Sequence, residues 1–245
     1  MATPRFYAPL DLAADAVGRT IELPEAVAHH ATRVVRLGLG AALTLFTGHG
    51  GEFATTLAHV DKRGAAVRID AFDPIERESP LAVVLVQAIA ANDAMDYAVR
   101  KTTEAGVSAI QPLITARSAP LPAGERGDKR HAHWQQVAIA ACEQCGRNRI
   151  PAIHVAQTFA AWLAAASGDA IALLPEALHD LASLPAPAAT MALLVGPEGG
   201  WDAAEMTAMR TRGIATVRLG PRVLRTETAG VAALAAMQLL WGDYR

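Results

Sequence analysis

The clearest pattern in the chain is a series of short apolar runs that alternate with helical segments from residue 81 onward. Residues 81–90 form an apolar run interrupted only by Gln87, as expected for a parallel strand buried on both faces. Further strands are predicted at 107–115, 152–155, 170–174, 191–195 and 214–219. Helices are predicted at 93–105, 130–145, 202–212 and 226–241, with a short one after residue 158. This alternation predicts an α/β fold in which helices cover a parallel sheet.

Polar residues and glycines mark where several of these helices begin and end. Asp93 and Thr158 stand at expected N-cap positions, and Asp202 has Glu205 three residues later, the spacing of a capping box. Gly213 follows the helix at 202–212 and is expected to end it.

The first 72 residues have a different pattern, with short runs of β-forming residues separated by turn signals. Strands are predicted at 5–7, 20–23, 42–47, 52–60 and 65–69. One helix is expected from Pro24 to about Val35. Five short strands and one helix predict a compact β-barrel. The predicted organisation is therefore a barrel at 1–72, a charged and proline-containing linker at 73–80, and the α/β domain at 81–245.

The amino-acid composition limits the classes of protein to which the chain can belong. Hydrophobic residues make up 52% of the chain, which is ample for a buried core, and the net charge of −2 argues against a globally basic nucleic-acid binder. The start of the chain does not resemble a signal peptide, and the longest apolar run is too short to span a bilayer, so a cytoplasmic protein is expected. The two cysteines, Cys142 and Cys145, lack a second pair with which to complete a zinc site, and no metal is expected.

Two glycine-rich turns stand out in the last third of the chain. The first is LLVGPEGGW at 193–201, and the second lies within RLGPRVLRTET at 218–228. Each follows a predicted strand and precedes a helix, and ligands of open α/β sheets bind at the carboxyl ends of strands. Glycine lets a backbone approach a ligand closely. Either turn alone could be an ordinary connection, but the two together, with the polar residues Arg225 to Thr228, indicate a binding site.

These motifs resemble the RsmE family, SPOUT-class enzymes that methylate N3 of a uridine in 16S ribosomal RNA. The similar segments are GPEGGW, LGPRVLRTET, RKTTEAGVSAIQPLITARS at 100–118, AACEQCGRNRIPAI at 140–153, and more weakly RFY and HATRVVRL near the start. The resemblance implies a trefoil knot, S-adenosylmethionine as methyl donor, an amino-terminal PUA-like RNA-binding barrel and a homodimer. Ala91 and Ala94 depart from it, because lysine and arginine are common there in the family.

A sulfonium cofactor needs an apolar slot for adenine and backbone hydrogen-bond partners, and three strand ends offer loops of that kind. The expected cofactor-binding residues are Leu173, Leu174, Pro175, Leu194, Gly196, Pro197, Glu198, Gly199, Leu219, Gly220, Val223, Leu224 and Thr226. The chain has no GxGxxG, and GPEGG lacks the Lys-Ser/Thr of a phosphate-binding loop, which argues against nucleotide-binding alternatives.

Methylation at uridine N3 requires loss of the N3 proton, hence a base, a group that stabilises the uracil anion, or both. Arg225 suits the stabilising role because it stays cationic. Glu198 and Glu227 are the candidate bases. Glu227 is equally explained as an acid in the first turn of a helix, and Glu198 as a turn residue that bonds its own loop.

RNA contact is expected from local basic residues, since residues 117–149 hold six basic and three acidic side chains. The expected contacts are Arg5, Arg33, Arg36, Arg126, Lys129, Arg130, Arg147 and Arg149. Arg33 and Arg36 would project together if both lay on the helix. Part of the closing helix, at about 227–241, is expected to pack on a second copy of the chain. The alternatives are a SPOUT enzyme that modifies a ribose 2′-hydroxyl and a non-catalytic RNA-binding or ribosome-assembly protein.

Overall fold

The computed structural model describes residues 3–244, so the outermost ends of the predicted domains, at residues 1 and 245, lie outside the described part. The chain divides into two compact units. The first contains the described residues up to Glu78 together with Cys142–Ile150, and the second contains Ser79–Ala141 and the chain from Pro151 onward. We describe each unit by itself.

The first unit contains a five-stranded sheet in the order β1-β3-β4-β5-β2. Its strands are β1 (Arg5–Tyr7), β2 (Thr20–Glu22), β3 (Ala42–Phe46), β4 (Glu52–Val60) and β5 (Ala65–Asp73), close to the predicted ranges. Neighbouring strands of this sheet are antiparallel except for β1 and β3, which are parallel. Phe53, Thr55 and Leu57 alternate inward along β4, and the two apolar side chains pack with Phe6, Leu45 and other buried residues in one core.

The helix of the first unit has the predicted extent but is less regular than predicted. Pro24 is the N-cap of α1 (Glu25–His29), and a π-helical segment, His30–Val34, continues it. Val35 is the C-cap, and Arg36 has a φ of 62°, in the left-handed region. The prediction that Arg33 and Arg36 share one helical face is therefore wrong, because Arg36 lies in the turn that ends the helix.

The segment Cys142–Ile150 belongs to the first unit through contacts that the sequence did not predict. Arg5 Nη2 donates to Asn148 Oδ1 at 2.7 Å, and Asn148 Nδ2 donates to the Ile75 carbonyl at 2.9 Å. Arg147 Nε donates to Glu78 Oε1 at 3.0 Å, and Arg147 is only 4% exposed. Basic residues of this segment are thus neutralised by acids that lie far away in the sequence.

We expect Glu52 to stabilise this unit at neutral pH and to lose this contribution in acid. Burial raises the pKa of Glu52, but hydrogen bonds from Arg77 and Arg5 outweigh it, and the pKa lies below the ordinary value. The stabilisation is present above the ordinary glutamate pKa and is lost as the pH falls through the lower folded-state value. Urea unfolding of Glu52→Gln should show a lower unfolding free energy than wild type at neutral pH, with the difference shrinking in acid. A difference that stays constant across this range would contradict the linkage.

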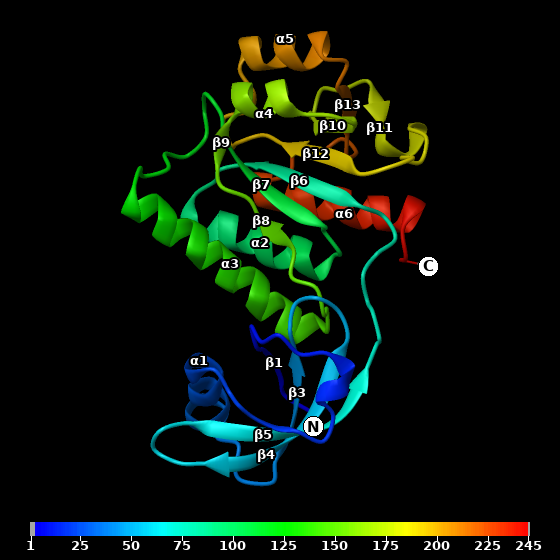
Figure 1. Ribbon diagram of the computed structural model, residues 1–245. Coiled ribbons are helices and arrows are strands. Elements are labelled where there is room, and N and C mark those ends of the chain that lie inside the picture. Colours follow the sequence, from blue (N-terminus) through cyan, green and yellow to red (C-terminus); the bar gives the residue numbers. More distant parts are fainter. Residues whose placement is uncertain (1–2, 245) are drawn as a thin grey trace. The chain divides into compact units, whose positions relative to one another are not determined.

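The second unit is built on a parallel sheet of eight strands, in the order β11-β13-β10-β12-β6-β7-β8, with β9 also paired to β7 (Figure 1). The strands are β6 (Val83–Ala88), β7 (Ala109–Ile114), β8 (Ala152–Ile153), β9 (Gln157–Thr158), β10 (Asp169–Leu173), β11 (His179–Asp180), β12 (Met191–Val195) and β13 (Ala215–Arg218). Each pair of neighbouring strands is parallel, as predicted from the apolar runs. The short strands β9 and β11 were not predicted.

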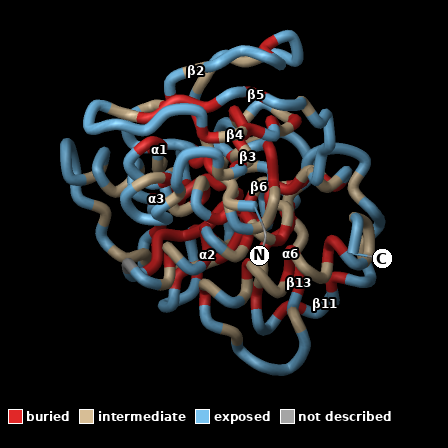
Figure 2. Tube along the Cα trace, turned by 90° about the horizontal axis from the view of Figure 1, so that it is seen from below, coloured by how far each residue is buried: buried red, intermediate tan, exposed pale blue. Residues whose placement is uncertain are grey.

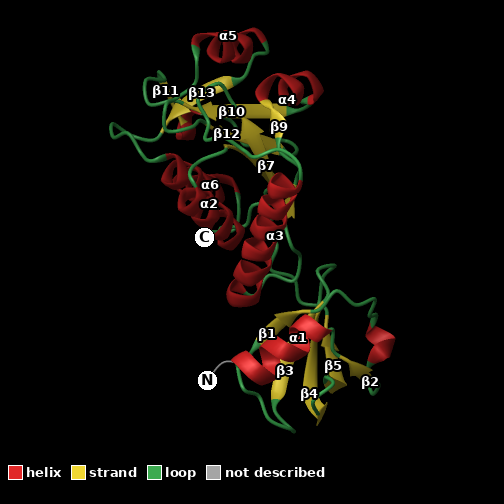
Figure 3. Cartoon of the chain, turned by 90° about the vertical axis from the view of Figure 1, so that its left-hand side faces the viewer, coloured by secondary structure: helices red, strands yellow, loops and turns green. Residues whose placement is uncertain are grey.

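Helices lie on both faces of this sheet: α4 and α5 cover one face, and α2, α3 and α6 lie on the other (Figure 3). Their bounds are α2 (Asn92–Glu104), α3 (Glu125–Cys145), α4 (Phe159–Ala165), α5 (Ala203–Thr211) and α6 (Thr226–Trp241). Buried residues gather along the central strand β6 and on parts of α2 and α6 (Figure 2). Within the described residues, no helix has the length and apolarity needed to cross a membrane.

Most helix-end predictions are confirmed. Asp202 and Glu205 form the capping box of α5, the Thr158 hydroxyl accepts from Ala161 N, and Gly213 follows α5 with a φ of 76°. Asp93 is not the N-cap of α2, because the helix begins one residue earlier with Ala91 as its cap. Asp93 instead stands in the first turn, where an acid complements the helix dipole.

Candidate functional site

A cavity of about 740 Å³ lies at the carboxyl ends of five neighbouring strands, β13, β10, β12, β6 and β7. We call it the strand-end pocket. Its walls come from the loops after these strands and from the starts of α2 and α6. The volume is in the range of small-molecule sites, and the position is the one at which open α/β sheets bind ligands. Its lining residues include Ala91, Ala94, Arg117, Leu173–Glu176, Val195–Trp201, Met206, Val217–Leu219, Arg222–Glu227 and Ala229.

The structure brings together nearly all of the predicted cofactor residues. Those that line the strand-end pocket are Leu173, Leu174, Pro175, Gly196, Pro197, Glu198, Gly199, Leu219, Val223, Leu224 and Thr226. Leu194 does not, because it is fully buried within β12 in the core beneath. Gly220 also lies outside the lining. Its φ of 69° explains the glycine, and a Cβ there would meet no described atom within 4 Å.

The first glycine turn is shaped by a close contact. A Cβ built on Gly196 would lie 2.9 Å from Nε1 and 3.0 Å from Cε2 of Trp201. The Trp201 indole is buried and packs against Phe159 with ring centroids 5.7 Å apart. Gly200 N donates to the Pro197 carbonyl at 2.9 Å and closes the turn. The absence of a side chain at Gly196 therefore lets Trp201 lie against the backbone of the pocket wall.

A buried hydrogen-bond chain connects this turn to the start of α6. Gln87 Nε2 donates to Thr226 Oγ1 at 2.9 Å, and Thr226 Oγ1 donates to the Gly196 carbonyl at 2.6 Å. Gln87 is fully buried at the end of β6. The chain fixes the spacing between β6, the turn after β12 and the first residue of α6, three elements that contribute to the strand-end pocket.

We expect Thr226→Val to loosen this spacing. Valine keeps the shape of threonine but leaves the Gly196 carbonyl and the Gln87 amide without their shared partner, at a cost of about 1–3 kcal/mol. Denaturant unfolding should show that loss, and ligand affinity of the pocket should fall with it. Thr228→Val, at an exposed position of the same helix, is the matched control and should leave both unchanged.

The three predicted catalytic residues also meet at the strand-end pocket. Arg225 is the N-cap of α6, and it is an exposed residue that lines the pocket. Glu227 stands half-buried in the first turn of α6, and Glu198 is exposed in the first glycine turn. A cation and two carboxylates at one cavity can stabilise a developing anion and accept a proton.

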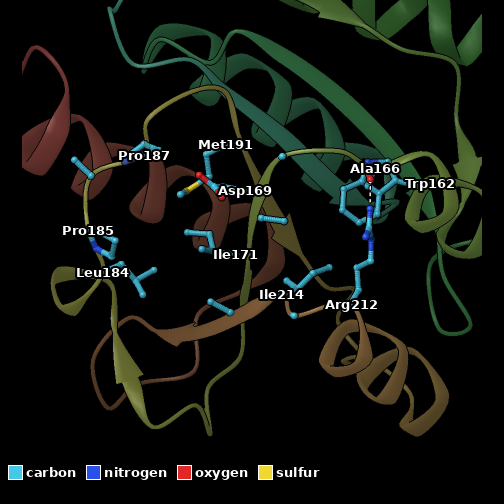
Figure 4. A pocket seen from close by; sticks show the side chains of 15 residues that line it. Trp162, Ala166, Asp169, Ile171, Leu184, Pro185, Pro187, Met191, Arg212 and Ile214 are labelled. Atoms are coloured by element: carbon cyan, nitrogen blue, oxygen red, sulfur yellow. Dashed lines mark hydrogen bonds between the residues drawn. The ribbon is translucent and has the colours of Figure 1, made fainter.

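A second cavity, of about 360 Å³, lies at the amino ends of β10, β12 and β13 (Figure 4). Its walls include Asp169, Met191 and the proline-containing loop at 184–187. Arg212 also lines it and donates to the Ala166 carbonyl. None of the predicted catalytic or cofactor residues lies among its lining residues. The strand-end pocket is therefore the candidate site.

Known protein families match both the first and the later part of the chain. A family model described as RNA methyltransferase domain matches residues 77–238, and one described as RNA methyltransferase PUA domain matches residues 23–70. The ribosomal RNA small subunit methyltransferase E of Buchnera aphidicola subsp. Schizaphis graminum is 30% identical over 229 residues, which are 93% of this chain and 93% of that protein. The chain belongs to the ribosomal RNA small subunit methyltransferase E (RsmE) family.

Two solved structures are similar over nearly the whole chain. An RsmE protein from Neisseria gonorrhoeae bound to S-adenosyl methionine is 36% identical, with a TM-score of 0.92 and full coverage of both chains. A putative methyltransferase from Legionella pneumophila, also in complex with this cofactor, is 35% identical with a TM-score of 0.95, covering 99% of this chain and 100% of the other. The predicted family is thus confirmed.

The basic residues expected to contact RNA fall into two groups in this RsmE chain. Arg33 and Arg36 of the first unit and Arg126 and Lys129 at the start of α3 are exposed, and Lys129 pairs with Glu125 at 2.7 Å. Arg130 stacks over the Trp134 ring, with 5.9 Å between the guanidinium carbon and the ring centroid. The others are ion-paired within the first unit, as Arg5–Glu52, Arg147–Glu78 and Arg149–Glu76.

The cysteines take no part in the strand-end pocket. Cys142 is fully buried, and burial raises the pKa of its thiol to about 12, so the side chain is a neutral thiol. Its Sγ lies 3.6 Å from the Arg149 carbonyl, which it can contact as a weak donor. These observations agree with a structural role for Cys142.

Several lining residues were missed by reasoning from the sequence. Arg117, Glu176, Trp201 and Arg222 line the strand-end pocket, and Arg218 does so while its guanidinium pairs with Asp180 at 2.9 Å. A signal existed for some of them, because Trp201 ends GPEGGW and Arg222 lies inside LGPRVLRTET. Arg117 lies in a different strand-end loop, and only the fold brings it to the pocket.

Proposed function

We propose that this chain methylates N3 of a specific uridine in 16S rRNA of the small ribosomal subunit, with S-adenosylmethionine as methyl donor. The observation that supports this most is the convergence of both glycine turns, Arg225, Glu198 and Glu227 on one cavity. The names of the relatives support the class of substrate, and the cofactor of two similar solved structures supports the donor.

The residues present fit such a cofactor. Leu173, Leu174 and Pro175 form one apolar wall, Gly196 to Gly199 line a second, and Leu219, Val223 and Leu224 belong to a third. The close approach of Trp201 to Gly196 leaves this wall tightly packed. When bound, S-adenosylmethionine supplies a methyl group on a positively charged sulfur.

The side chains of the chain itself have two tasks in the reaction. The N3–H of uridine must lose its proton, for which Glu227 and Glu198 are the proposed acceptors, with Glu227 favoured because it is half-buried. Arg225 is proposed to stabilise the negative charge that develops on uracil O2 or O4. The pocket walls hold the base and the donor in near-attack geometry and exclude water.

Two measurements test the proposal. Calorimetric titration with S-adenosylmethionine should show stoichiometric binding, whereas a non-catalytic RNA-binding protein that kept the fold would show none. Mass-spectrometric nucleoside analysis of 16S rRNA from a deletion strain should show loss of N3-methyluridine. Loss of a 2′-O-methyl nucleoside instead would favour the SPOUT enzyme that acts on ribose.

We propose further that the first unit is a PUA-like barrel that contacts RNA, and that residues 191–241 form a trefoil knot. Strand β13 lies between β11 and β10, and α6 then packs against β6, β12 and α2, which supports a chain that crosses its own path.

For RNA contact, the exposed Arg33, Arg36 and Arg126 are better placed than the buried Arg147. Arg126→Ala should weaken rRNA binding more than Arg147→Lys does.

We propose that the active form is a homodimer that uses part of α6. Leu234 and Gln238 of this helix are fully buried within the chain, and Gln238 bonds Ser79 and the Ala105 carbonyl. Leu239 is 61% exposed, with Val231 and Ala235 half-buried on the same helix, and they form the apolar surface open to a second copy. Sedimentation should show a dimer in wild type and monomer in Leu239→Glu.

A further inference from the structure

The loops that follow β6 and β7 contribute a single cation to the described lining of the strand-end pocket. In the order β13-β10-β12-β6-β7, the loops proposed for the cofactor follow the first three strands, and the opposite end follows β6 and β7. At that end Ala91 and Ala94, at the start of α2, offer only methyl groups. Arg117, in the loop after β7, is the charged lining residue that these two loops contribute.

Arg117 is held in a fixed turn. Its Nη1 donates to the Gly199 carbonyl at 2.8 Å, and the preceding amide, Ala116 N, donates to Glu205 Oε1 at 2.8 Å. Ser118 Oγ accepts from Thr115 N at 3.1 Å and closes the turn. The same Glu205 carboxylate completes the capping box of α5, so the turn is bound to a regular helix end. The Arg117 side chain is nevertheless exposed.

We propose that Arg117 binds an RNA phosphate next to the target uridine and so orients the nucleotide at the pocket. This inference rests on the proposed function. One N–H of the guanidinium anchors the side chain to Gly199, and arginine has five such donors in a planar fork that suits phosphate. An RNA strand whose base enters the pocket must pass over its rim, and Arg117 places a preoriented cation on that rim, next to Gly199 of the first glycine turn.

The alternative is that Arg117 only secures the Gly199 carbonyl and thereby the cofactor loop. Arg117→Gln separates the two roles, because glutamine keeps an N–H donor and most of the packing but removes the charge. The matched control is Arg212→Gln: Arg212 is also exposed and also donates to a backbone carbonyl, but it lies at the second cavity. Both variants change the net charge equally.

The measurement is binding to small ribosomal subunits, purified from a strain lacking the gene, across a series of salt concentrations. For Arg117→Gln we expect about tenfold weaker binding and a salt slope smaller by about 0.7–0.9, the value for one phosphate contact. Calorimetric affinity for S-adenosylmethionine and the melting temperature should stay at wild-type values. Arg212→Gln should match wild type in every assay.

A second-site variant makes the test sharper. Ala94→Arg places a new cation at the same end of the pocket, and in the Arg117→Gln background it should recover most of the salt slope. An unchanged slope in Arg117→Gln, or a loss of cofactor affinity without loss of RNA affinity, would overturn the proposal. If the wild-type protein binds the subunits and its affinity falls with rising salt, but it forms no N3-methyluridine, the proposed function fails, while the binding data still test the phosphate contact of Arg117. If the wild-type protein does not bind the subunits, both proposals are rejected.

Discussion

Arg225→Ala is expected to lower methyl transfer by about two to three orders of magnitude at saturating RNA and cofactor. A preorganised donor at a developing oxyanion is worth roughly 3–4 kcal/mol in the transition state. Arg225 stands at the N-cap of α6 without a capping bond from its side chain, so its replacement should cost little stability. Single-turnover methylation of small-subunit rRNA, with circular dichroism to show that the variant is folded, measures the effect.

The conservative variant and a neighbouring arginine serve as controls. Arg225→Lys should restore little if two planar donors are needed, because lysine is a point charge. Arg222→Ala removes another exposed arginine that lines the strand-end pocket and should affect RNA affinity rather than the saturated rate. A near-normal rate for Arg225→Ala at saturation would remove Arg225 from the chemistry and leave it an RNA or loop contact.

Features encoded over a few residues could be predicted from the sequence. The capping box of Asp202 and Glu205 and the glycine end of α5 depend on spacings of a few residues, and they lie where predicted. The parallel sheet follows from apolar runs such as that of β6, whose side chains are almost all buried. The two glycine turns were correctly placed at strand ends, because strand, turn and helix are consecutive in the chain.

Contacts between distant segments could not be predicted in the same way. The basic surplus of residues 117–149 pointed to an RNA surface, but Arg147 and Arg149 are paired with Glu78 and Glu76, about seventy residues away in the sequence. Gln87 interrupts an apolar run without any sign that it bonds Thr226, 139 positions later. Arg117 reaches the pocket only because β7 lies beside β6 in the sheet. The contacts of these residues can be assigned only once the three-dimensional arrangement of the strands and loops is known.

Gly196→Val is the second substitution for which we expect a large effect, the loss of cofactor binding. A Cβ there would lie 2.9 Å from the Trp201 indole nitrogen, a distance that real Cβ contacts do not show, so Gly196→Val must push the indole or the turn aside. Overpacking of a well-filled site typically costs about 1–3 kcal/mol, and here the displaced atoms form the wall proposed for the cofactor. We expect calorimetric titration of Gly196→Val with S-adenosylmethionine to show no measurable binding.

Three further substitutions distinguish the effect of this contact from a general loss of stability. Gly213 has a φ of 76°, and a Cβ at that position would meet only open space, so Gly213→Ala should cost about 1–2 kcal/mol of stability from backbone strain without loss of cofactor affinity. Trp201→Leu removes the indole, and in that background Gly196→Ala should lose much less affinity than it does in wild type. The coupling between the two substitutions, obtained from a double-mutant cycle, should exceed about 0.5 kcal/mol. Additive losses would show that Trp201 is not what requires glycine at position 196.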